Sequence, residues 1–453
     1  MSLPRYPEYK DSGVEWLGEV PGHWEINQLK HAYSVVGGST PSSGVPEFWD
    51  GSIVWVTPAD LSRLKSFEIV SSLRTITDAG LASCGTNLLP VGSIVLSTRA
   101  PIGSLGIAEV ELCTNQGCKG LVPKSEQCSL FGAYLIAVMG GELNIQGRGT
   151  TFLELSGEAL GAVKIPLPPE SEQACIAAFL DRETGKIDTL VAEQQNLIAL
   201  LKEKRQALIS HAVTKGLDPD LPMKDSGVAW LGEVPAHWEV TRLKFVATVQ
   251  TGVAKGKDNE GKDCVAVPYL RVANVQDGYL DLDEIAVIQI PVVDLSRYRL
   301  QVGDVLMNEG GDFDKLGRGH IWNGEILDCI HQNHVFAVRP VAVTPEWLNT
   351  VTGADYAQFY FMSRSKQSTN LASISSTNLM ELPVVLPPPD EQVAILDGIA
   401  RDAGKIDALV SEAEIGVALL QARRTALISA AVTGKIDVRH LVAATADPTL
   451  EPA

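Results

Sequence analysis

The chain has 453 residues, of which 45% are hydrophobic and 20% charged, a composition typical of an ordinary globular protein of two to four domains and not of a disordered one. Its net charge of −18 argues against a protein that coats nucleic acid without sequence preference, because neutralising phosphates requires a basic face. The charge leaves room for DNA contact through a few local basic loops, particularly if partner subunits supply much of the phosphate contact.

Membrane and metal chemistry are not expected. No run of residues approaches the roughly 20 apolar positions that span a bilayer, and MSLPRYPEYKDSG at the N-terminus lacks the apolar core of a signal peptide. The seven cysteines lack the paired CxxC spacing of a structural zinc site. We therefore expect a cytoplasmic protein with reduced structural thiols, and we expect the two histidines of HQNH (331–334) to be surface or satisfied residues.

Two nearly identical segments divide the chain into halves. KDSGVEWLGEVPGHWEINQLK (10–30) and KDSGVAWLGEVPAHWEVTRLK (224–244) differ at only five of 21 positions. A repeat period above 200 residues indicates duplicated domains and not a solenoid of short units. The tryptophans that both copies share (Trp16, Trp24, Trp230 and Trp238) predict a packed turn that opens each domain, a structural role that we favour over ligand stacking.

The segments between the repeated blocks, 31–165 and 245–385, have diverged much further. Their apolar alternation predicts short strands, which fall in matching pairs: 52–61 with 267–275, and 92–99 with 303–310. A polar segment follows in each half, CTNQGCKGL (113–121) and CIHQNHVFAV (329–338), and helical turns are expected near 129–140 and 345–363. Each half is thus predicted to contain a mixed α+β domain.

Polar side chains gather at the ends of these predicted strands and in the following loops. Arginine suits guanine, asparagine and glutamine suit adenine, and serine and threonine suit either, so we predict that the loops contact DNA. Because polar loop residues are usually only solvated, we expect about a third of the set to touch a base or a phosphate. The candidates are Ser97, Thr98, Arg99, Asn115, Gln116, Lys119, Arg148 and Thr150 in the first half, and Lys255, Lys257, Arg271, Asn274, Asn308, Lys315, Arg318, Gln332, Asn333 and Asn378 in the second.

A long helix is predicted to close each half. The blocks 168–214 and 388–433 align at a constant offset of 219 after one residue is skipped. Each begins with prolines and acidic residues and ends with basic ones, which is typical of helix termini. Apolar residues recur in alternating steps of four and three, as in a coiled-coil seam. The predicted seam residues are Ile176, Leu180, Ile187, Leu190, Leu197, Leu201 and Leu208 in the first helix, and Ile395, Ile399, Ile406, Leu409, Leu420 and Leu427 in the second.

The two stripes match in length and register, so the simplest partner of each helix is the other. Polar residues interrupt both stripes at equivalent places, namely Glu183 and Asp402, and Lys204 and Arg423. An antiparallel pair would set acid against base at these places, whereas a parallel pair would set acid against acid. The alternative is that each helix packs separately on its own domain.

Motifs of catalysis are missing from the sequence. It contains no GxxxxGK[ST] phosphate loop, GxSxG elbow, HExxH or GxGxxG after a strand, and GGDFDKLGRG (310–319) has the wrong spacing for a nucleotide fingerprint. These absences favour a binding protein.

The motif order gives the chain a family resemblance. PLPPESEQ before a heptad helix that ends in KRQALISHAVTKG, its repeat from PPPDEQ to RRTALISAAVTGKID, and WLGEVPxHWE before each diverged segment resemble the specificity subunit of type I restriction-modification enzymes over about residues 4–440. The resemblance implies an α+β fold in which two target recognition domains are joined by an antiparallel coiled coil with a pseudo-two-fold internal repeat. The expected divisions are recognition domain 1 at 1–166, helix 1 at 167–215, recognition domain 2 at 216–386, helix 2 at 387–440 and a flexible tail at 441–453.

The same resemblance implies a mechanism and partners. Each recognition domain would contact one half of a bipartite, asymmetric sequence in double-stranded DNA, and the helices would fix the gap between the halves and dock two modification subunits. Those subunits would bind S-adenosylmethionine and methylate adenine, and restriction subunits would use ATP and Mg²⁺, so no cofactor or metal is expected in this chain. The base contacts cannot be carried over, because the contacting loops differ from member to member.

Two other functions are consistent with parts of the sequence. A coiled-coil adaptor that binds proteins and no nucleic acid would explain the acidic charge and the helices, but not why duplicated domains keep their frames and vary their loops. An enzyme with an unfamiliar site is the second alternative, and the missing motifs argue against it.

Overall fold

The computed structural model describes residues 3–99, 102–124, 127–146, 154–256, 261–311, 316–317, 319–367 and 372–443. The predicted tail beyond residue 443, and five of the predicted DNA-contacting residues, lie outside these ranges. The chain divides into two compact units, one made of Met1–Gln194 with Gly416–Ala453 and the other of Gln195–Ile415.

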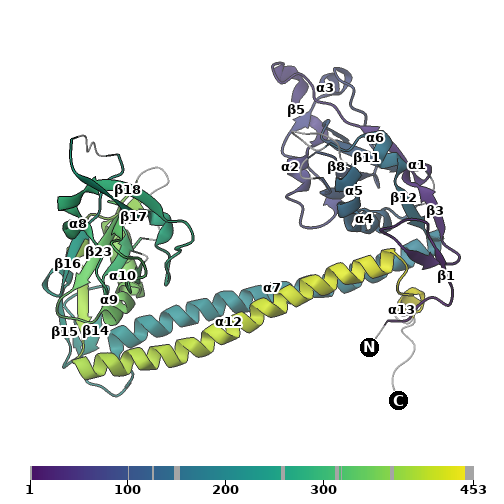
Figure 1. Cartoon of the computed structure of the whole chain (residues 1–453). Coiled ribbons are helices and arrows are strands. Elements are labelled where there is room, and N and C mark those ends of the chain that lie inside the picture. Colours follow the sequence, from purple (N-terminus) through teal and green to yellow (C-terminus); the bar gives the residue numbers. More distant parts are fainter. Residues whose placement is uncertain are drawn as a thin grey trace, which may run out of the picture. The chain divides into compact units, whose positions relative to one another are not determined.

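The first unit is a mixed α+β domain (Figure 1). Its strands are β1 Tyr9–Asp11, β2 Glu19–Pro21, β3 Glu25–Gln28, β4 Tyr33–Gly37, β5 Trp49–Val56, β6 Glu68–Ile69, β7 Thr75–Ile76, β8 Ile94–Ser97, β9 Leu105–Ala108, β10 Leu112–Thr114, β11 Cys118–Pro123 and β12 Lys164–Leu167. Its short helices are α1 Leu29–Ala32, η1 Pro46–Phe48, α2 Pro58–Leu61, α3 Asp78–Ala82, α4 Ser129–Val138, α5 Gly140–Gln146, α6 Gly157–Ala162 and α13 Arg439–Ala443. The main sheet has the order β4-β11-β8-β9-β6, and a second sheet has the order β10-β5-β7.

The second unit repeats this plan. Its strands are β13 Met223–Asp225, β14 Glu233–Pro235, β15 Glu239–Arg242, β16 Ala247–Thr251, β17 Cys264–Leu270, β18 Ala286–Pro291, β19 Val305–Asn308, β20 Gly310–Gly311, β21 Gly319–Ile321, β22 Ile330–His331, β23 Val335–Pro340, β24 Lys366–Gln367, β25 Ala372–Ser373 and β26 Pro383–Leu386. Its short helices are η2 Leu243–Phe245, η3 Val272–Asn274, α8 Val292–Tyr298, α9 Pro345–Thr352, α10 Asp355–Arg364 and α11 Ser376–Met380. The order β16-β23-β19-β21 matches β4-β11-β8-β9, and the parallel pair β17 and β22 matches β5 and β10.

The predicted strands are confirmed, except that both members of the first pair end earlier than predicted. The segment 267–275 is strand only to Leu270, and Val272–Asn274 is a 3₁₀ turn. The segment 52–61 continues as strand only to Val56, and Pro58–Leu61 is instead a helical turn. Thr57 caps that turn, since its backbone N–H donates to Asp60 Oδ2 at 2.8 Å and Pro58 occupies the first helical position. Alternation of apolar residues alone could not separate this capped turn from the strand before it.

Two long helices carry the repeated blocks. Helix α7 spans Glu170–Lys215 and α12 spans Pro389–Val432, close to the predicted bounds, and they run side by side (Figure 1). In the first unit Arg424 of α12 donates to Asp188 of α7 at 2.7 and 3.1 Å, and in the second Arg205 of α7 donates to Asp407 of α12 at 2.8 Å. Early α7 thus meets late α12 and late α7 meets early α12, so the predicted antiparallel pairing is confirmed.

The seam follows a heptad frame that differs from the predicted one by one residue at every second position. Leu180, Ile187, Leu201 and Leu208 are buried or half-buried as predicted, as are their α12 counterparts Ile399, Ile406, Leu420 and Leu427. Leu190, Leu197 and Leu409 were predicted in the seam but are 45%, 44% and 50% exposed. Their neighbours are buried or half-buried instead, and the complete alternate set is Ala177, Thr184, Val191, Ile198, Arg205 and Ala212 in α7 and Leu396, Ala403, Val410, Val417, Arg424 and Ala431 in α12.

The ends of the helices also pack into the units. Ile176 and Leu180 lie in the core of the first unit with Ile428 of α12, and Ile395 and Ile399 lie in the core of the second. Coiled-coil pairing and packing on the local domain therefore coexist, each on a different part of the same helix.

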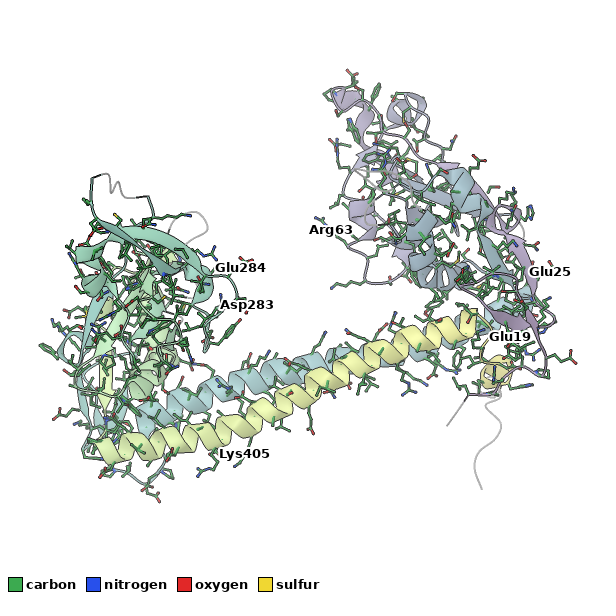
Figure 2. All side chains as sticks on the ribbon, viewed as in Figure 1. Glu19, Glu25, Arg63, Asp283, Glu284 and Lys405 are labelled. Atoms are coloured by element: carbon green, nitrogen blue, oxygen red, sulfur yellow. The ribbon has the colours of Figure 1, made fainter. Side chains whose placement is uncertain are left out.

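The predicted charge pairs across the seam are wrong. Glu183 pairs with Arg182 and Lys186 of its own helix, and Asp402 pairs in the same way with Arg401 and Lys405. These neighbours lower the pKa of both carboxyl groups, first through the hydrogen bond from the i+3 lysine. The long side chain of Lys405 extends from the surface of α12, where local pairing is open to it (Figure 2). The ion pairs that do join the two helices are made by Arg205 and Arg424, which belong to the alternate seam positions.

Helix α12 contains an 18-residue window with a mean hydropathy of 1.3, long and apolar enough to cross a membrane by length and composition alone. This is weak evidence for a membrane span, because the same helix pairs with α7 and carries ion pairs to it. The coiled coil accounts for its apolar character.

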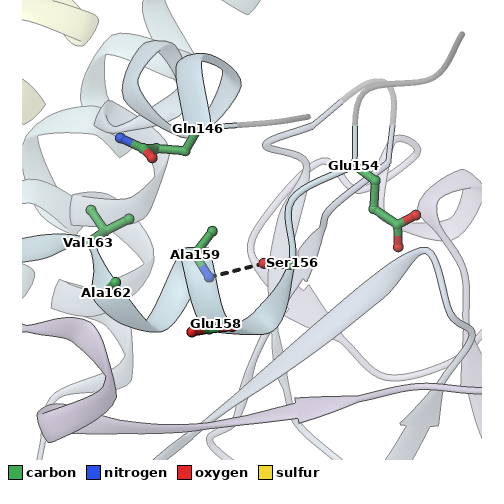
Figure 3. Close-up of a pocket in the computed structure, with 7 residues that line it drawn as sticks. All are labelled: Gln146, Glu154, Ser156, Glu158, Ala159, Ala162 and Val163. Atoms are coloured by element: carbon green, nitrogen blue, oxygen red, sulfur yellow. Dashed lines mark hydrogen bonds between the residues drawn. The ribbon is translucent and has the colours of Figure 1, made fainter. Parts of the chain in front are cut away.

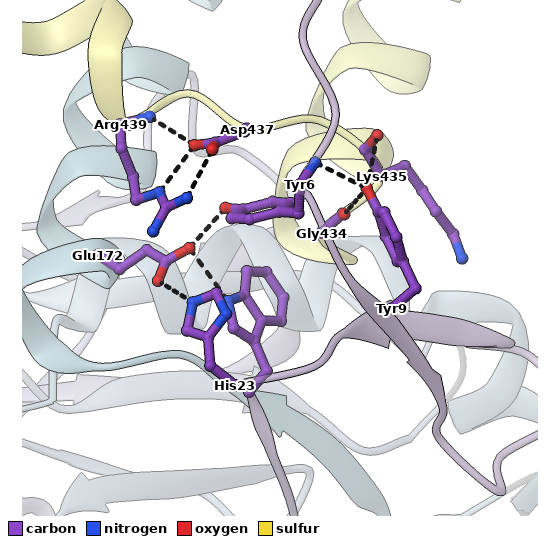
Figure 4. A network of polar contacts seen from close by, with 9 residues as sticks. Tyr6, Tyr9, His23, Glu172, Gly434, Lys435, Asp437 and Arg439 are labelled. Carbon is purple, nitrogen blue, oxygen red and sulfur yellow. Dashed lines mark hydrogen bonds and ion pairs between the residues drawn. The ribbon is translucent and has the colours of Figure 1, made fainter.

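In the first unit the two ends of the chain close on each other around Glu172 (Figure 4). The buried Glu172 carboxylate accepts from Tyr6 Oη at 2.5 Å and Trp24 Nε1 at 3.1 Å, and its other oxygen contacts His23 Nε2 at 2.8 Å. Asp437 N donates to the Pro4 carbonyl at 2.8 Å, and Lys435 Nζ donates to that of Glu19. In the second unit Lys215 donates to the carbonyl of Glu233 in the same way. There the long helix runs directly into the following strands along one chain, whereas in the first unit the same contact joins the C-terminal end of the chain to the N-terminal one.

We expect Glu172→Gln to destabilise the protein. The amide of glutamine has one oxygen, whereas Tyr6, Trp24 and His23 all contact the Glu172 carboxylate. Its NH₂ group would face at least one of these donors, and a buried group left unpaired costs about 1–3 kcal/mol. Glu391 is the matched control, because in the second unit it contacts only His237 among the residues described. Urea unfolding should show a clear loss of free energy for Glu172→Gln and less than about 1 kcal/mol for Glu391→Gln. Equal losses would contradict this account of the network.

Candidate nucleic-acid interface

Each unit contains an equivalent turn that carries two neighbouring amide side chains. The turn joins β10 to β11 in the first unit, with Asn115 and Gln116, and β22 to β23 in the second, with Gln332 and Asn333. Asn115 N donates to the Val56 carbonyl at 2.9 Å, and Gln332 N donates to the Leu270 carbonyl at 2.8 Å. Asn115 therefore corresponds to Gln332, and Gln116 to Asn333.

This correspondence corrects the alignment of the polar segments by one residue. The sequence places Gln116 opposite Gln332, since CTNQ and CIHQ share a cysteine and a glutamine. The hydrogen bonds of the parallel strands instead match Trp55 with Tyr269 and Thr114 with His331. The amide pairs coincide only in this register.

A loop lies against each turn, and the sequence analysis named Lys255 of the second loop but no residue of the first. Residues 38–45 follow β4, and residues 252–256 follow β16. Ser39 N donates to the Thr114 carbonyl at 3.0 Å, and Val253 N donates to the His331 carbonyl at 2.9 Å. The carbonyls of these two loop residues accept from Trp55 Nε1 at 3.0 Å and from Tyr269 Oη at 2.8 Å. Each unit thus fixes its loop through an aromatic donor on the same strand.

Glycine is required where loop and turn meet. A Cβ at Gly38 would lie 2.2 Å from the Asn115 carbonyl oxygen, and one at Gly252 would lie 2.1 Å from that of His331. Neither position tolerates a side chain without moving backbone. The glycine found 214 residues apart in both repeats was the available signal for these loops.

An exposed arginine in the first unit was also missed. The Arg74 guanidinium lies 3.6 Å from the ring centroid of Trp49, and Trp49 Nε1 donates to the Ser42 carbonyl at 3.1 Å. One buried indole therefore holds both the 38–45 loop and a cation, and stacking fixes the plane of the guanidinium.

Four predicted contact residues are buried, so in this structure they cannot reach DNA. Ser97 and Thr98 are fully buried at the end of β8, and Asn274 and Asn308 are 3% and 6% exposed. Asn274 Nδ2 donates to the carbonyls of Asp281 and Glu284, and Asn308 Nδ2 donates to that of Val275 at 2.8 Å. The structure gives these polar groups a role in holding strand ends and turns.

Other predicted residues are accessible, and three of them already have partners. Arg99 pairs with Glu154 at 3.2 Å, Arg271 donates to the Glu284 carbonyl at 3.0 Å, and Asn378 Nδ2 donates to that of Arg364 at 3.1 Å. Lys255 is exposed and Lys119 is half-buried. The remaining predicted residues lie outside those described, namely Arg148, Thr150, Lys257, Lys315 and Arg318.

The HQNH histidines and the cysteines behave as structural groups. His331 is fully buried, with Nδ1 at 2.7 Å from the Val335 carbonyl and Nε2 without a partner among the described residues, and burial lowers its pKa. His334 is exposed, so the prediction of surface or satisfied residues holds for His334 and for one ring nitrogen of His331. All seven cysteines are free thiols. Burial raises the pKa of Cys118 and of Cys329 to about 12 each, so both stay uncharged at neutral pH.

A surface pocket of about 390 Å³ in the first unit is lined by Gln146, Glu154, Ser156, Glu158, Ala159, Ala162 and Val163 (Figure 3). The Ser156 hydroxyl in this lining caps a helix, because it accepts a hydrogen bond from Ala159 N at 3.1 Å. Glu154 pairs with Arg99. The described lining therefore offers two carboxylates, one of them paired with Arg99, and an amide, but no nucleophile hydrogen-bonded to a base.

Comparisons with known proteins agree on one family. A family model described as the type I restriction modification DNA specificity domain matches residues 21–199. The specificity subunit of the type I restriction enzyme MjaIX from Methanocaldococcus jannaschii is 31% identical over 278 residues, which are 60% of this chain and 62% of that protein. The EcoKI specificity subunit of Escherichia coli is 22% identical over 363 residues, 72% of this chain and 75% of that one. The match thus spans less than two thirds of the archaeal relative.

Solved structures of this family share the fold. A chain from a study of assembly and conformational transition in a type I restriction-modification system aligns with a TM-score of 0.67 and 18% identity, over 91% of this chain and 98% of that one. The HsdS subunit from Thermoanaerobacter tengcongensis aligns with a TM-score of 0.50, over 92% and 98%.

Proposed function

Because the chain belongs to the type I restriction-modification DNA specificity subunit family, we propose that its two units recognise the two halves of a bipartite DNA sequence. The observation that carries this proposal is the repeated site: in both units a glycine, an aromatic donor and a pair of amides occupy equivalent places. The frame is constant, while the side chains that it presents differ. Such an arrangement suits two readers with different targets.

The paired helices would fix the spacing between the half-sites. Two reciprocal ion pairs, Arg424 with Asp188 and Arg205 with Asp407, link equivalent residues of the two repeats. Each pair is more than a third exposed on both sides and adds little stability by itself. Together they support one register of α7 against α12, and a single register would give a single gap in the DNA sequence.

Partner subunits would dock on the outward side of the helices. Leu190 and Leu197 lie two helical turns apart on α7, Leu409 lies on α12, and all three are about half exposed. Large apolar side chains in a row on a paired helix indicate a protein contact surface. We assign this surface to two modification subunits, and expect restriction subunits to join them.

The partner subunits, and not this chain, would carry out catalysis. We propose a non-catalytic, cytoplasmic subunit, with S-adenosylmethionine, ATP and Mg²⁺ bound by its partners. The net charge of −18 is consistent with this division, because base edges need only local contacts while phosphates are neutralised by partner subunits.

Selection from a random DNA library by the chain in complex with its modification subunits tests the proposal. We expect enrichment of one asymmetric sequence made of two short defined blocks and an undefined gap of constant length. Enrichment of no sequence, with the complex intact, would contradict DNA recognition and favour the adaptor function, for which the comparisons give no support.

A further inference from the structure

Gln116 and Asn333 hold equivalent positions in the two turns but have different neighbours. Each follows the amide residue whose backbone N–H is bonded to the parallel strand, Asn115 in one unit and Gln332 in the other. The oxygens of those first amides are engaged inside the fold: Asn115 Oδ1 accepts from Gly117 N at 2.9 Å, and Gln332 Oε1 accepts from Val272 N at 3.3 Å. The second amide of each pair is therefore the better candidate for contact with a base.

In the first unit the loop orients Gln116. The Thr40 hydroxyl donates to Gln116 Oε1, and the side chain of Gln116 is exposed. Thr40 belongs to the 38–45 loop, which the glycine and Trp55 hold in place. With its oxygen bonded to the loop, Gln116 presents its NH₂ group, a hydrogen-bond donor.

In the second unit a relay orients Asn333 in the opposite sense. Glu309 Oε2 lies 2.8 Å from His334 Nδ1, and His334 Nε2 lies 3.2 Å from Asn333 Nδ2. The Asn333 NH₂ group can only donate, so the His334 Nε2 that it contacts is the acceptor, and Nδ1, which faces a carboxylate, carries the proton. Asn333 thus bonds to the ring through its NH₂, and its oxygen, an acceptor, has no hydrogen-bond partner among the described residues.

We propose that these two side chains give the two half-sites opposite hydrogen-bond requirements, an inference that rests on the proposed function. Gln116 would recognise a base edge that accepts, such as guanine O6 and N7 or thymine O4. Asn333 would recognise an exocyclic amino group, adenine N6 or cytosine N4. One repeated frame then specifies an asymmetric target, because what differs is which end of the amide the neighbours hold.

A pair of acidic substitutions tests this polarity with matched charge. Gln116→Glu and Asn333→Asp each replace NH₂ by oxygen and add one negative charge. We measure binding of the complex with its modification subunits to a DNA panel in which every base pair of both half-sites is varied in turn. Gln116→Glu should lower the affinity for DNA roughly 5- to 150-fold, the effect of one lost base contact. It should also lose the ability to discriminate among bases at one base pair. Asn333→Asp should keep its discrimination within a few-fold, because an acceptor still faces the base.

Three further variants keep the test independent of folding. Gln116→Ala and Asn333→Ala should each abolish discrimination at one base pair of one half-site and leave the other half-site unchanged, which serves as the internal control. Thr40→Val should relax discrimination at the Gln116 base pair, because the amide is then free to rotate.

The outcomes separate the possible failures. Equal losses for the two acidic variants would overturn the opposite polarity. Unchanged discrimination in both alanine variants would overturn the assignment of these residues, while the wild-type complex still selected its target. A wild-type complex without sequence preference would reject the proposed function itself.

Discussion

Insertion of seven residues into α7 alone, between Gln194 and Gln195, should abolish assembly of the protein. Asp188 precedes Arg205 on α7 by the same 17 residues that separate Asp407 from Arg424 on α12, and both cross-helix pairs depend on this equality. A heptad added to one helix preserves its own apolar stripe, but the knobs of one half no longer meet their holes. We expect aggregation or proteolysis in place of a soluble complex, measured by size-exclusion chromatography of the co-expressed subunits.

The matched control adds a heptad to both helices, at the equivalent place in α12. Register is then restored, so the protein should assemble. Seven residues lengthen a helix by about 10.5 Å, or about three base pairs at 3.4 Å each, so the selected DNA sequence should keep both half-sites and gain about three undefined positions. An assembled protein from the single insertion, or an unchanged gap from the double one, would contradict the role of the helices as a spacer.

Exchange of residues 31–165 for the corresponding segment of another family member should replace one half of the DNA target completely and leave the other intact. The segment contains the 38–45 loop, the Asn115 turn and Arg74, but neither α7 nor any residue of the second unit. Its core contacts with Trp24 and Ile176 must be preserved for folding. Methylation mapping of the hybrid complex provides the measurement.

The reciprocal exchange of residues 245–385 is its control and should change only the other half. A change of both halves in either hybrid would mean that the units do not recognise DNA independently. Loss of all methylation by a hybrid that still assembles would place specificity outside the exchanged segments.

The long helices were predictable because a heptad stripe over more than 40 residues leaves few alternatives. The frame of the stripe was harder to predict, because Leu190 and Leu197 are followed by Val191 and Ile198, which are of similar hydrophobicity. Only the partner decides which neighbour turns inward, and here Arg205 and Arg424 enter the seam because an aspartate of the other helix lies opposite each of them. Excess leucine beside the seam is then left exposed.

The candidate site was predictable in part. The amide turns were identified from composition, but the pairing of Gln116 with Asn333 depends on strand register, which sequence similarity placed one residue off. Ser97 and Asn308 were chosen as polar residues at strand ends, and strand direction turns both inward. The 38–45 loop and Arg74 carried no strong motif, and their position follows from long-range contacts with Thr114 and Trp49.

Adenine methylation of host DNA, mapped at single-base resolution with and without this gene, tests the central claim most directly. If the chain directs a modification complex, one split motif with a constant gap will lose methylation when the gene is deleted. A methylation pattern that is identical in both strains, with the gene expressed, would contradict the claim.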